Sequence, residues 1–166
     1  MQKMLIVDPN KCTGCRTCEV VCSARHEGGV NPLRSRIHVI KWEWEGFTMP
    51  FFCQQCRNAP CITVCPVRAL SRDEEEYGRI KIDRDKCIGC KLCIAVCPFG
   101  GMGWDPVSNK VIKCDFCHGD PMCVKFCTTE AIRFEYIPEV SIKKKRTMVS
   151  NIKESIKGEQ PELIAI

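Results

Sequence analysis

The stretch Cys87-Ile88-Gly89-Cys90-Lys91-Leu92-Cys93-Ile94-Ala95-Val96-Cys97-Pro98 decides how this chain folds. Two residues separate each of the first three cysteines, and the fourth follows after three more and precedes a proline. A loop with this spacing can wrap one face of a cubane [4Fe–4S] cluster and present three thiolates to its iron atoms. In proteins with two clusters, the fourth cysteine of such a run binds the neighbouring cluster. The stretch therefore predicts iron–sulfur binding.

Three more cysteine tetrads vary this pattern, and together the four tetrads use all 16 cysteines. In chain order, tetrad 1 is Cys12, Cys15, Cys18 and Cys22, tetrad 2 is Cys53, Cys56, Cys61 and Cys65, tetrad 3 is the stretch above, and tetrad 4 is Cys114, Cys117, Cys123 and Cys127. Pro66 follows tetrad 2, whereas Ser23 and Thr128 stand at that place in tetrads 1 and 4. Zinc sites prefer two C-x-x-C pairs separated by a longer loop. Four [4Fe–4S] clusters are therefore predicted, with zinc or disulfides as minor alternatives.

The cysteine content also helps to predict the cellular compartment of the protein. In a secreted chain, 16 cysteines among 166 residues would indicate a disulfide scaffold. The N-terminus has neither the apolar region nor the twin-arginine stretch of an export signal. No run approaches the roughly 20 apolar residues of a membrane span. We therefore expect a cytoplasmic protein without a transmembrane segment, in which reduced thiols bind metal.

The formal net charge of the chain is +5 when every cysteine is counted as neutral. Sixteen thiolates and four oxidised cluster cores of about +2 each would bring the loaded protein to about −3. The basic composition therefore gives no support to a nucleic-acid partner. Residues 140–166 hold six Lys and Arg against three acids. This basic C-terminal extension is expected to be a partner-docking arm or a solvated tail, and its small apolar face makes a membrane-surface segment the weaker alternative.

Short strands and helices are predicted around the tetrads. Residues 37–44 are rich in β-branched and aromatic side chains, and Glu45-Gly46 can turn them into a second strand at residues 47–52. Further strands are predicted at residues 78–83, 111–113 and 131–137. The last two cysteines of each tetrad are spaced to lie on one face of a short helix. This pattern indicates an α+β fold with much loop, which cluster binding helps to stabilise.

The four-tetrad pattern of residues 4–137 resembles the ferredoxin-type electron-transfer subunits of molybdopterin and tungstopterin oxidoreductases. The iron–sulfur subunits of dimethyl sulfoxide reductase and formate dehydrogenase typify that family. The resemblance implies two nested bacterial-ferredoxin-like folds, in which tetrad 1 pairs with tetrad 4 and tetrad 2 with tetrad 3. The double ferredoxin-like body is expected to span residues 1–139, and the extension of residues 140–166 follows it. The missing prolines fall on the same pair of tetrads, which agrees with this nesting.

The resemblance also implies which cysteines share a cluster, because the last cysteine of each tetrad crosses to the partner tetrad. Cluster 1 takes Cys12, Cys15, Cys18 and Cys127, cluster 2 takes Cys53, Cys56, Cys61 and Cys97, cluster 3 takes Cys87, Cys90, Cys93 and Cys65, and cluster 4 takes Cys114, Cys117, Cys123 and Cys22. Gly14 and Gly89 lie inside two binding loops, where glycine lets backbone N–H groups approach sulfur. The need for a tight turn in the chain would also explain the glycine at these two positions. His118 follows Cys117 and is expected to lie at the surface, with a role beside cluster 4 as the alternative.

No motif supports catalysis by the chain itself, since it has no Rossmann fingerprint, P-loop or hydrolase elbow. The resemblance implies a heteromer, in which this chain relays electrons between a large tungsten- or molybdenum-pterin subunit and a soluble ferredoxin or another redox subunit. The compact length looks most like the small subunit that accompanies tungsten enzymes of the aldehyde ferredoxin oxidoreductase family, including benzoyl-CoA reductase. The alternatives are a formate dehydrogenase, hydrogenase or carbon monoxide dehydrogenase partner, or a free-standing polyferredoxin carrier.

Overall fold

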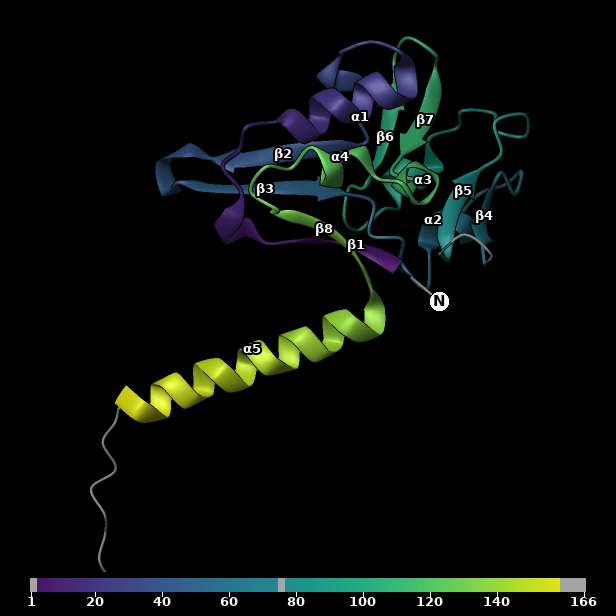
Figure 1. The fold of residues 1–166 in the computed structure, drawn as a ribbon. Coiled ribbons are helices and arrows are strands. Elements are labelled where there is room, and N and C mark those ends of the chain that lie inside the picture. Colours follow the sequence, from purple (N-terminus) through teal and green to yellow (C-terminus); the bar gives the residue numbers. More distant parts are fainter. Residues whose placement is uncertain (1–2, 75–76, 159–166) are drawn as a thin grey trace, which may run out of the picture.

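The computed structural model of the chain describes residues 3–74 and 77–158. Within these residues, short strands form four separate two-stranded antiparallel sheets (Figure 1). The sheets pair β1 (Lys3–Val7) with β8 (Ile132–Tyr136), β2 (Ile37–Trp42) with β3 (Phe47–Phe52), β4 (Leu70–Asp73) with β5 (Arg79–Ile82), and β6 (Met102–Asp105) with β7 (Lys110–Lys113). Three pairs are local hairpins, whereas β1 and β8 bring together segments from near the two ends of the chain.

Four helices begin at or near cysteines, and a fifth follows the last strand. They are α1 (Thr17–Glu27), α2 (Pro60–Thr63), α3 (Leu92–Ala95), α4 (Met122–Lys125) and α5 (Ile137–Gly158). Short 3-10 turns are η1 (Pro9–Lys11), η2 (Pro32–Arg34), η3 (Glu43–Glu45) and η4 (Phe116–Gly119). The mixture of short helices, antiparallel strands and long loops confirms the predicted α+β fold class.

The predicted hairpin of residues 37–52 is present, with one difference in its first strand. That strand ends at Trp42, because Glu43–Glu45 forms η3 and Gly46 closes the turn with a left-handed φ of 63°. Glycine adopts this conformation without a steric cost. The strands predicted at residues 78–83, 111–113 and 131–137 correspond to β5, β7 and β8. β1, β4 and β6 are not among the predicted strands.

The buried apolar side chains form two clusters, one for each pair of tetrads. The cluster of the terminal half, which we define as residues 3–52 and 114–136, contains Leu5, Cys18, Cys22, Ile37, Val39, Phe52, Phe116, Cys123 and Ile132. The cluster of the central half, residues 53–113, contains Ala59, Cys61, Leu70, Ile80, Cys93, Met102 and Val111. The central half is thus inserted into a terminal half built from two distant segments, which is the nested arrangement that the resemblance implies.

A buried hydrogen-bond network joins the two halves. Lys113 is buried at the end of β7, and its Nζ donates to the carbonyl oxygens of Ile80 and Cys114 at 2.5 and 2.7 Å. The Nε2 of Gln55 donates to the same Cys114 carbonyl at 2.6 Å. The Oε1 of Gln55 accepts the backbone N–H of Ile80 at 2.8 Å. Gln55 and Lys113 therefore bring the loop of tetrad 2 and the start of tetrad 4 together.

An ion pair makes a second connection between the halves. Arg34, in η2 of the terminal half, donates from Nε and Nη2 to the two carboxylate oxygens of Asp105 at 2.9 and 2.6 Å. Asp105 ends β6 in the central half, and its side chain is buried. The Arg34 guanidinium holds the pKa of this carboxyl well below its usual range. A bidentate pair of this kind fixes orientation as well as distance.

The helix α5 begins at Ile137, directly after β8, and extends away from the sheets (Figure 1). Residues 141–150 are exposed along it. The Nζ of Lys143 lies 2.8 Å from Oε1 of Glu135, which ties the first turns of α5 to β8. In the described parts of the chain, no helix combines the length and the apolar character that crossing a membrane requires. Residues 159–166 of the predicted extension lie outside the described residues.

Candidate metal centres

All four tetrads share one feature of backbone conformation. The residue before the second cysteine adopts a left-handed φ in each of them: 67° at Gly14, 50° at Gln55, 70° at Gly89 and 60° at Phe116. Turns that include a left-handed residue direct successive N–H groups into one concavity, which favours a bound anion. The glycines at two of these positions give a sequence signal for this turn. Gln55 and Phe116 give none, so the shared conformation could not be read from composition.

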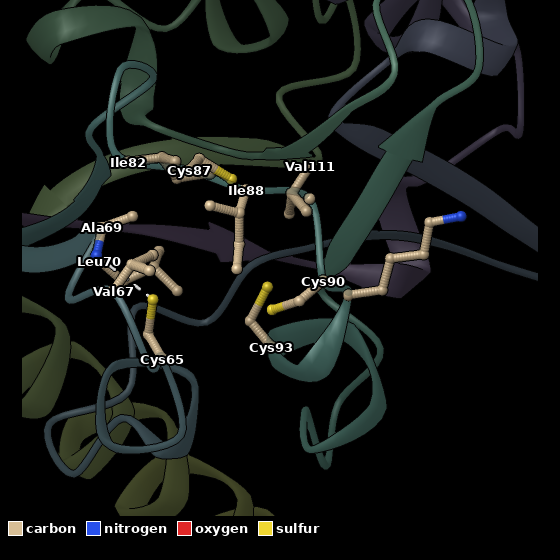
Figure 2. Close-up of a pocket in the computed structure, with 12 residues that line it drawn as sticks. Cys65, Val67, Ala69, Leu70, Ile82, Cys87, Ile88, Cys90, Cys93 and Val111 are labelled. Carbon is tan, nitrogen blue, oxygen red and sulfur yellow. Dashed lines mark hydrogen bonds between the residues drawn. The ribbon is translucent and has the colours of Figure 1, made fainter.

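One cavity gathers cysteines from tetrads 2 and 3. Its lining includes Cys65, Cys87, Cys90 and Cys93, and Figure 2 shows the Cys65, Cys90 and Cys93 sulfur atoms directed toward a common space. Apolar side chains complete the wall, Ile88 among them. The backbone N–H of Ala69 donates to Cys65 Sγ at 3.3 Å, the kind of contact that stabilises a thiolate. This is the cysteine set that the family resemblance implies for cluster 3.

A second cavity gathers cysteines from tetrads 1 and 4. Cys12, Cys15, Cys18 and Cys127 all line it. Cys127 follows α4, whereas the other three precede or begin α1, so the cavity joins segments more than 100 residues apart in sequence. The hydroxyl of Thr129 lies 3.7 Å from Cys127 Sγ. This set equals the one implied for cluster 1.

The pKa shifts of the remaining cysteines indicate that cysteines from different tetrads lie close together. Burial raises the pKa of Cys53 and Cys61, and the charge of Cys97 raises the pKa of both further. Burial likewise raises the pKa of Cys123, with added contributions from the cysteines Cys114, Cys22 and Cys117. Cys97 thus lies near tetrad 2, and Cys22 lies near tetrad 4. These proximities match the crossed sets implied for clusters 2 and 4.

The buried thiols fit the donor chemistry of an iron–sulfur cluster. Burial raises the pKa of Cys18 and of Cys114 to about 12, and that of Cys93 to about 11. In the absence of a cluster these thiols are therefore protonated at neutral pH. Binding iron requires thiolates, so cluster insertion releases their protons and compensates the cost of buried negative charge with iron–sulfur bonds. Four groups of four cysteines in apolar surroundings fit four [4Fe–4S] clusters.

His26 is a residue beside the cysteines that the sequence does not single out. Its Nε2 lies 3.5 Å from Cys117 Sγ and 3.5 Å from Oδ1 of Asp115. His118, which is adjacent to Cys117 in sequence, has a side chain that is 64% exposed and places Nδ1 2.9 Å from Nη1 of Arg79. The His118 side chain lies at the surface, as expected. The one available signal for His26 is its position four residues after Cys22, on the same face of α1.

The chain also matches known proteins. The profile of a 4Fe-4S dicluster domain matches residues 44–137, and that of a 4Fe-4S binding domain matches residues 3–24. The polyferredoxin-like subunit of the aliphatic sulfonate oxidoreductase of Pyrococcus furiosus is 42% identical over 124 residues, which cover 74% of this chain and 70% of that protein. The thiosulfate reductase electron transfer subunit PhsB of Salmonella typhi is 32% identical over 156 residues, covering 86% and 80%.

Among solved structures, the active-site complex BamBC of benzoyl coenzyme A reductase with benzoyl-CoA contains a chain that is 23% identical. The match covers 93% of this chain and 96% of that chain, with a TM-score of 0.49. The dicluster-domain profile alone spans more than half of the sequence. The 16 cysteines, in tetrads with iron–sulfur spacing, provide ligands for four clusters. The chain therefore carries four [4Fe–4S] clusters and belongs to the family of ferredoxin-type electron-transfer subunits of oxidoreductases.

Proposed function

We propose that this chain relays electrons through its four clusters between a large tungsten- or molybdenum-pterin catalytic subunit and a ferredoxin or another redox protein. A [4Fe–4S] cluster supplies one-electron chemistry when bound. The observation that carries the proposal is the exposure of two cysteines: Cys15 and Cys90 are exposed, and they belong to different halves. The cysteines proposed for clusters 2 and 4 are buried or half-buried. Two clusters near the surface, connected by two clusters in the interior, would suit the relay of electrons through the protein.

The proposed ligand sets are the crossed sets that the resemblance implies. Cys12, Cys15, Cys18 and Cys127 would hold cluster 1; Cys53, Cys56, Cys61 and Cys97 cluster 2; Cys65, Cys87, Cys90 and Cys93 cluster 3; and Cys22, Cys114, Cys117 and Cys123 cluster 4. Gly14 and Gly89 would let the backbone of two loops approach sulfur, since their φ values are left-handed.

Contacts between the sets support the spatial order 1–4–2–3. The negative charge of a Cys18 thiolate raises the pKa of Cys123, so these two side chains lie close together. The sets of clusters 1 and 4 are therefore neighbours. Gln55, inside the loop of tetrad 2, donates to the carbonyl oxygen of Cys114 in tetrad 4. The charge of Cys61 acts on Cys93, which connects the sets of clusters 2 and 3. In this order the two exposed cysteines belong to the terminal clusters.

The surroundings of Cys90 support a protein contact rather than open solvent. Ile88 and Leu92 lie two residues before and two residues after this cysteine, and both are exposed. Val96 and Phe99, further along the same segment of chain, are exposed too. Apolar side chains that gather on a surface commonly mark a docking site. This patch would exclude water between the terminal cluster and a partner. It favours a subunit of a complex over a free-standing polyferredoxin carrier, which is the second candidate.

The relatives guide the choice of partner. Two of them bear the names of subunits of an aliphatic sulfonate oxidoreductase and a thiosulfate reductase. These names support a heteromer but do not distinguish tungsten from molybdenum. We favour a tungsten subunit of the aldehyde oxidoreductase or benzoyl-CoA reductase type, with a formate dehydrogenase, hydrogenase or carbon monoxide dehydrogenase as alternatives. Sixteen cysteines in iron–sulfur tetrads, which require reduced thiols, favour a reducing compartment such as the cytoplasm.

The extension is the proposed arm that binds the catalytic subunit. Residues 141–150 of α5 are exposed, and they include four consecutive basic residues at positions 143–146. Ile142, Met148 and Val149 add exposed apolar surface on the same helix. A helix with both features can dock on an acidic surface that has an apolar groove. Residues 140–166 would then be separate in function from the cluster-binding body of residues 1–139.

Affinity purification of the tagged chain from its own cell, under anaerobic conditions, tests the function. A large subunit should copurify, and metal analysis should find tungsten or molybdenum beside iron. The double substitution Lys145→Glu and Arg146→Glu on α5 should weaken this association. Lys81→Glu on β5, at an exposed lysine outside the tetrads and the apolar patch, should leave it intact. A soluble, reducible monomer that retains no large subunit would instead support the free-standing carrier.

A further inference from the structure

We propose that His26 sets the reduction potential of cluster 4 by donating a hydrogen bond from Nε2 to the Sγ of Cys117. The inference rests on the proposed ligand set, in which Cys117 holds that cluster. Its basis is the 3.5 Å separation of the two atoms, with His26 contributed by α1 and Cys117 by η4. The two residues are 91 positions apart in sequence, so the fold, and not local chain geometry, brings them together.

The direction of the hydrogen bond follows from the chemistry of the sulfur. A cysteine bound to iron is a thiolate and carries no proton. It can therefore only accept, and Nε2 must carry the proton that lies between the two atoms. Sulfur hydrogen bonds to donors lower the energy of the extra electron on a reduced cluster, which raises its potential. His26 would thus make cluster 4 easier to reduce.

Burial strengthens this contact. The His26 side chain is 11% exposed, so water competes little for its N–H group, and a hydrogen bond in such surroundings is stronger than one in solvent. His118 contrasts with it at 64% exposure. His26 also differs from the third histidine of the chain, His38 on β2, which is exposed. His26 places Nε2 within hydrogen-bond range of a cysteine sulfur.

Charged groups surround His26, and the Asp115 carboxylate is a second acceptor for its Nε2–H proton. Oδ1 of Asp115 lies 3.5 Å from Nε2 and also accepts the backbone N–H of Cys117 at 3.0 Å. The other oxygen, Oδ2, lies 3.1 Å from Nη1 of Arg36. The backbone N–H of Arg36 donates to Cys22 Sγ at 3.3 Å. His26 and Arg36 therefore supply N–H groups to two different sulfurs of the same proposed set.

The test is a potentiometric titration of the anaerobically purified full chain, followed by electron paramagnetic resonance. His26→Leu removes the N–H donor and keeps an apolar side chain in place. We expect the midpoint potential of one cluster to shift to a more negative value while the other three stay unchanged. The component that shifts should be the one whose spectrum changes in Cys117→Ser. His26→Gln retains an amide N–H and should recover most of the shift, and His38→Leu is the matched control without an effect.

Iron analysis of each variant separates this inference from the proposed function. If His26→Leu retains the iron content of the parent chain but all four midpoints are unchanged, the role of His26 is refuted while the cluster assignment stands. An equal shift in His26→Gln and His26→Leu would also refute it, since packing and not the N–H group would then be the cause.

A measurement on the unsubstituted chain covers the case in which His26→Leu loses a cluster. Pulsed electron paramagnetic resonance of protein labelled with 15N-histidine should detect a nitrogen coupling to the same reduced cluster that changes in Cys117→Ser. Selective reduction of that cluster isolates the signal. The absence of any histidine coupling there would contradict the hydrogen bond directly.

Discussion

All four tetrads use the same cluster-binding loop, but tetrad 1 of the terminal half finishes it differently from tetrad 4 and from both tetrads of the central half. In tetrads 2, 3 and 4, the third residue after the last cysteine is left-handed: Arg68 at φ 51°, Gly100 at 64° and Glu130 at 53°. Each of these residues donates its N–H to the carbonyl oxygen of that cysteine, closing a tight turn. Arg25 occupies the same place in tetrad 1, but there the helix α1 continues to Glu27.

The residue after the last cysteine explains the contrast with the central half. Pro66 and Pro98 follow tetrads 2 and 3, and proline cannot continue a helix because it lacks an N–H and clashes with the preceding turn. Ser23 follows tetrad 1 instead, fully buried inside α1, where its Oγ donates to the Val20 carbonyl oxygen at 2.9 Å. The hydroxyl also accepts the backbone N–H of Asn31 at 3.1 Å.

The longer helix changes the surroundings of the clusters. It brings His26 to Cys117 and Glu27 to Arg34, whose Nη2 lies 2.5 Å from Glu27 Oε2. The central half ends its helices α2 and α3 before they could reach such partners. Proline at this position ends the helix in tetrads 2 and 3, whereas buried Ser23 lets α1 continue and supply polar side chains beside a neighbouring cluster. Tetrad 4 ends in a turn with Thr128 at this position, so the longer helix needs the hydrogen bonds of Ser23 as well as the absence of proline.

The largest expected effect comes from Ser23→Pro, which would make tetrad 1 like tetrads 2 and 3. Proline inside a helix costs about 3 kcal/mol or more, and both hydrogen bonds of the buried hydroxyl would be lost. We expect α1 to end near Cys22 and the terminal half to lose iron. Iron analysis and thermal unfolding measure this. Pro98→Ser in the central half is the matched control and should retain the iron. A stable Ser23→Pro protein with its full iron content would refute this role of Ser23.

An intermediate effect is expected at the junction of the halves. Gln55→Ala would take the acceptor from the Ile80 N–H and leave the Cys114 carbonyl with its hydrogen bond from Lys113. A buried polar group that is left unsatisfied costs about 1–3 kcal/mol, so we expect destabilisation of about 1–3 kcal/mol. Chemical denaturation of the anaerobic protein measures the change. Gln54→Ala alters the adjacent residue and should cost much less, and equal losses would contradict the account.

The smallest effects should have opposite signs in the two kinds of tetrad ending. Arg68→Gly would relieve a left-handed conformation in the central half and stabilise the protein by about 0.5–1 kcal/mol. Arg25→Gly alters the equivalent, helical residue of tetrad 1 and should destabilise it by about 0.5–1 kcal/mol. Both side chains are exposed, so few contacts are lost. Denaturation midpoints of the pair, measured side by side, check the signs; a common sign would mean that the endings do not differ as described.

The tetrads, the hairpin of β2 and β3 and the strand β5 could be predicted because their signals are local: cysteine spacing, a turn dipeptide and alternating side chains. The pairing of β1 with β8 could not, because a five-residue strand carries no information about a partner near the other end of the chain. The left-handed Gln55 and Phe116 lack the glycine that would reveal such a turn. The contact of His26 with Cys117 depends on tertiary packing, whereas His118 is adjacent to Cys117 in sequence and lies at the surface, as expected.

One chain holds four [4Fe–4S] clusters. Iron and acid-labile sulfide analysis of the anaerobically purified full chain tests it most directly. Four complete clusters predict about sixteen iron atoms and about sixteen sulfides per chain. A value near four iron atoms, without matching sulfide, would mean that the tetrads bind single metal ions and would contradict the account.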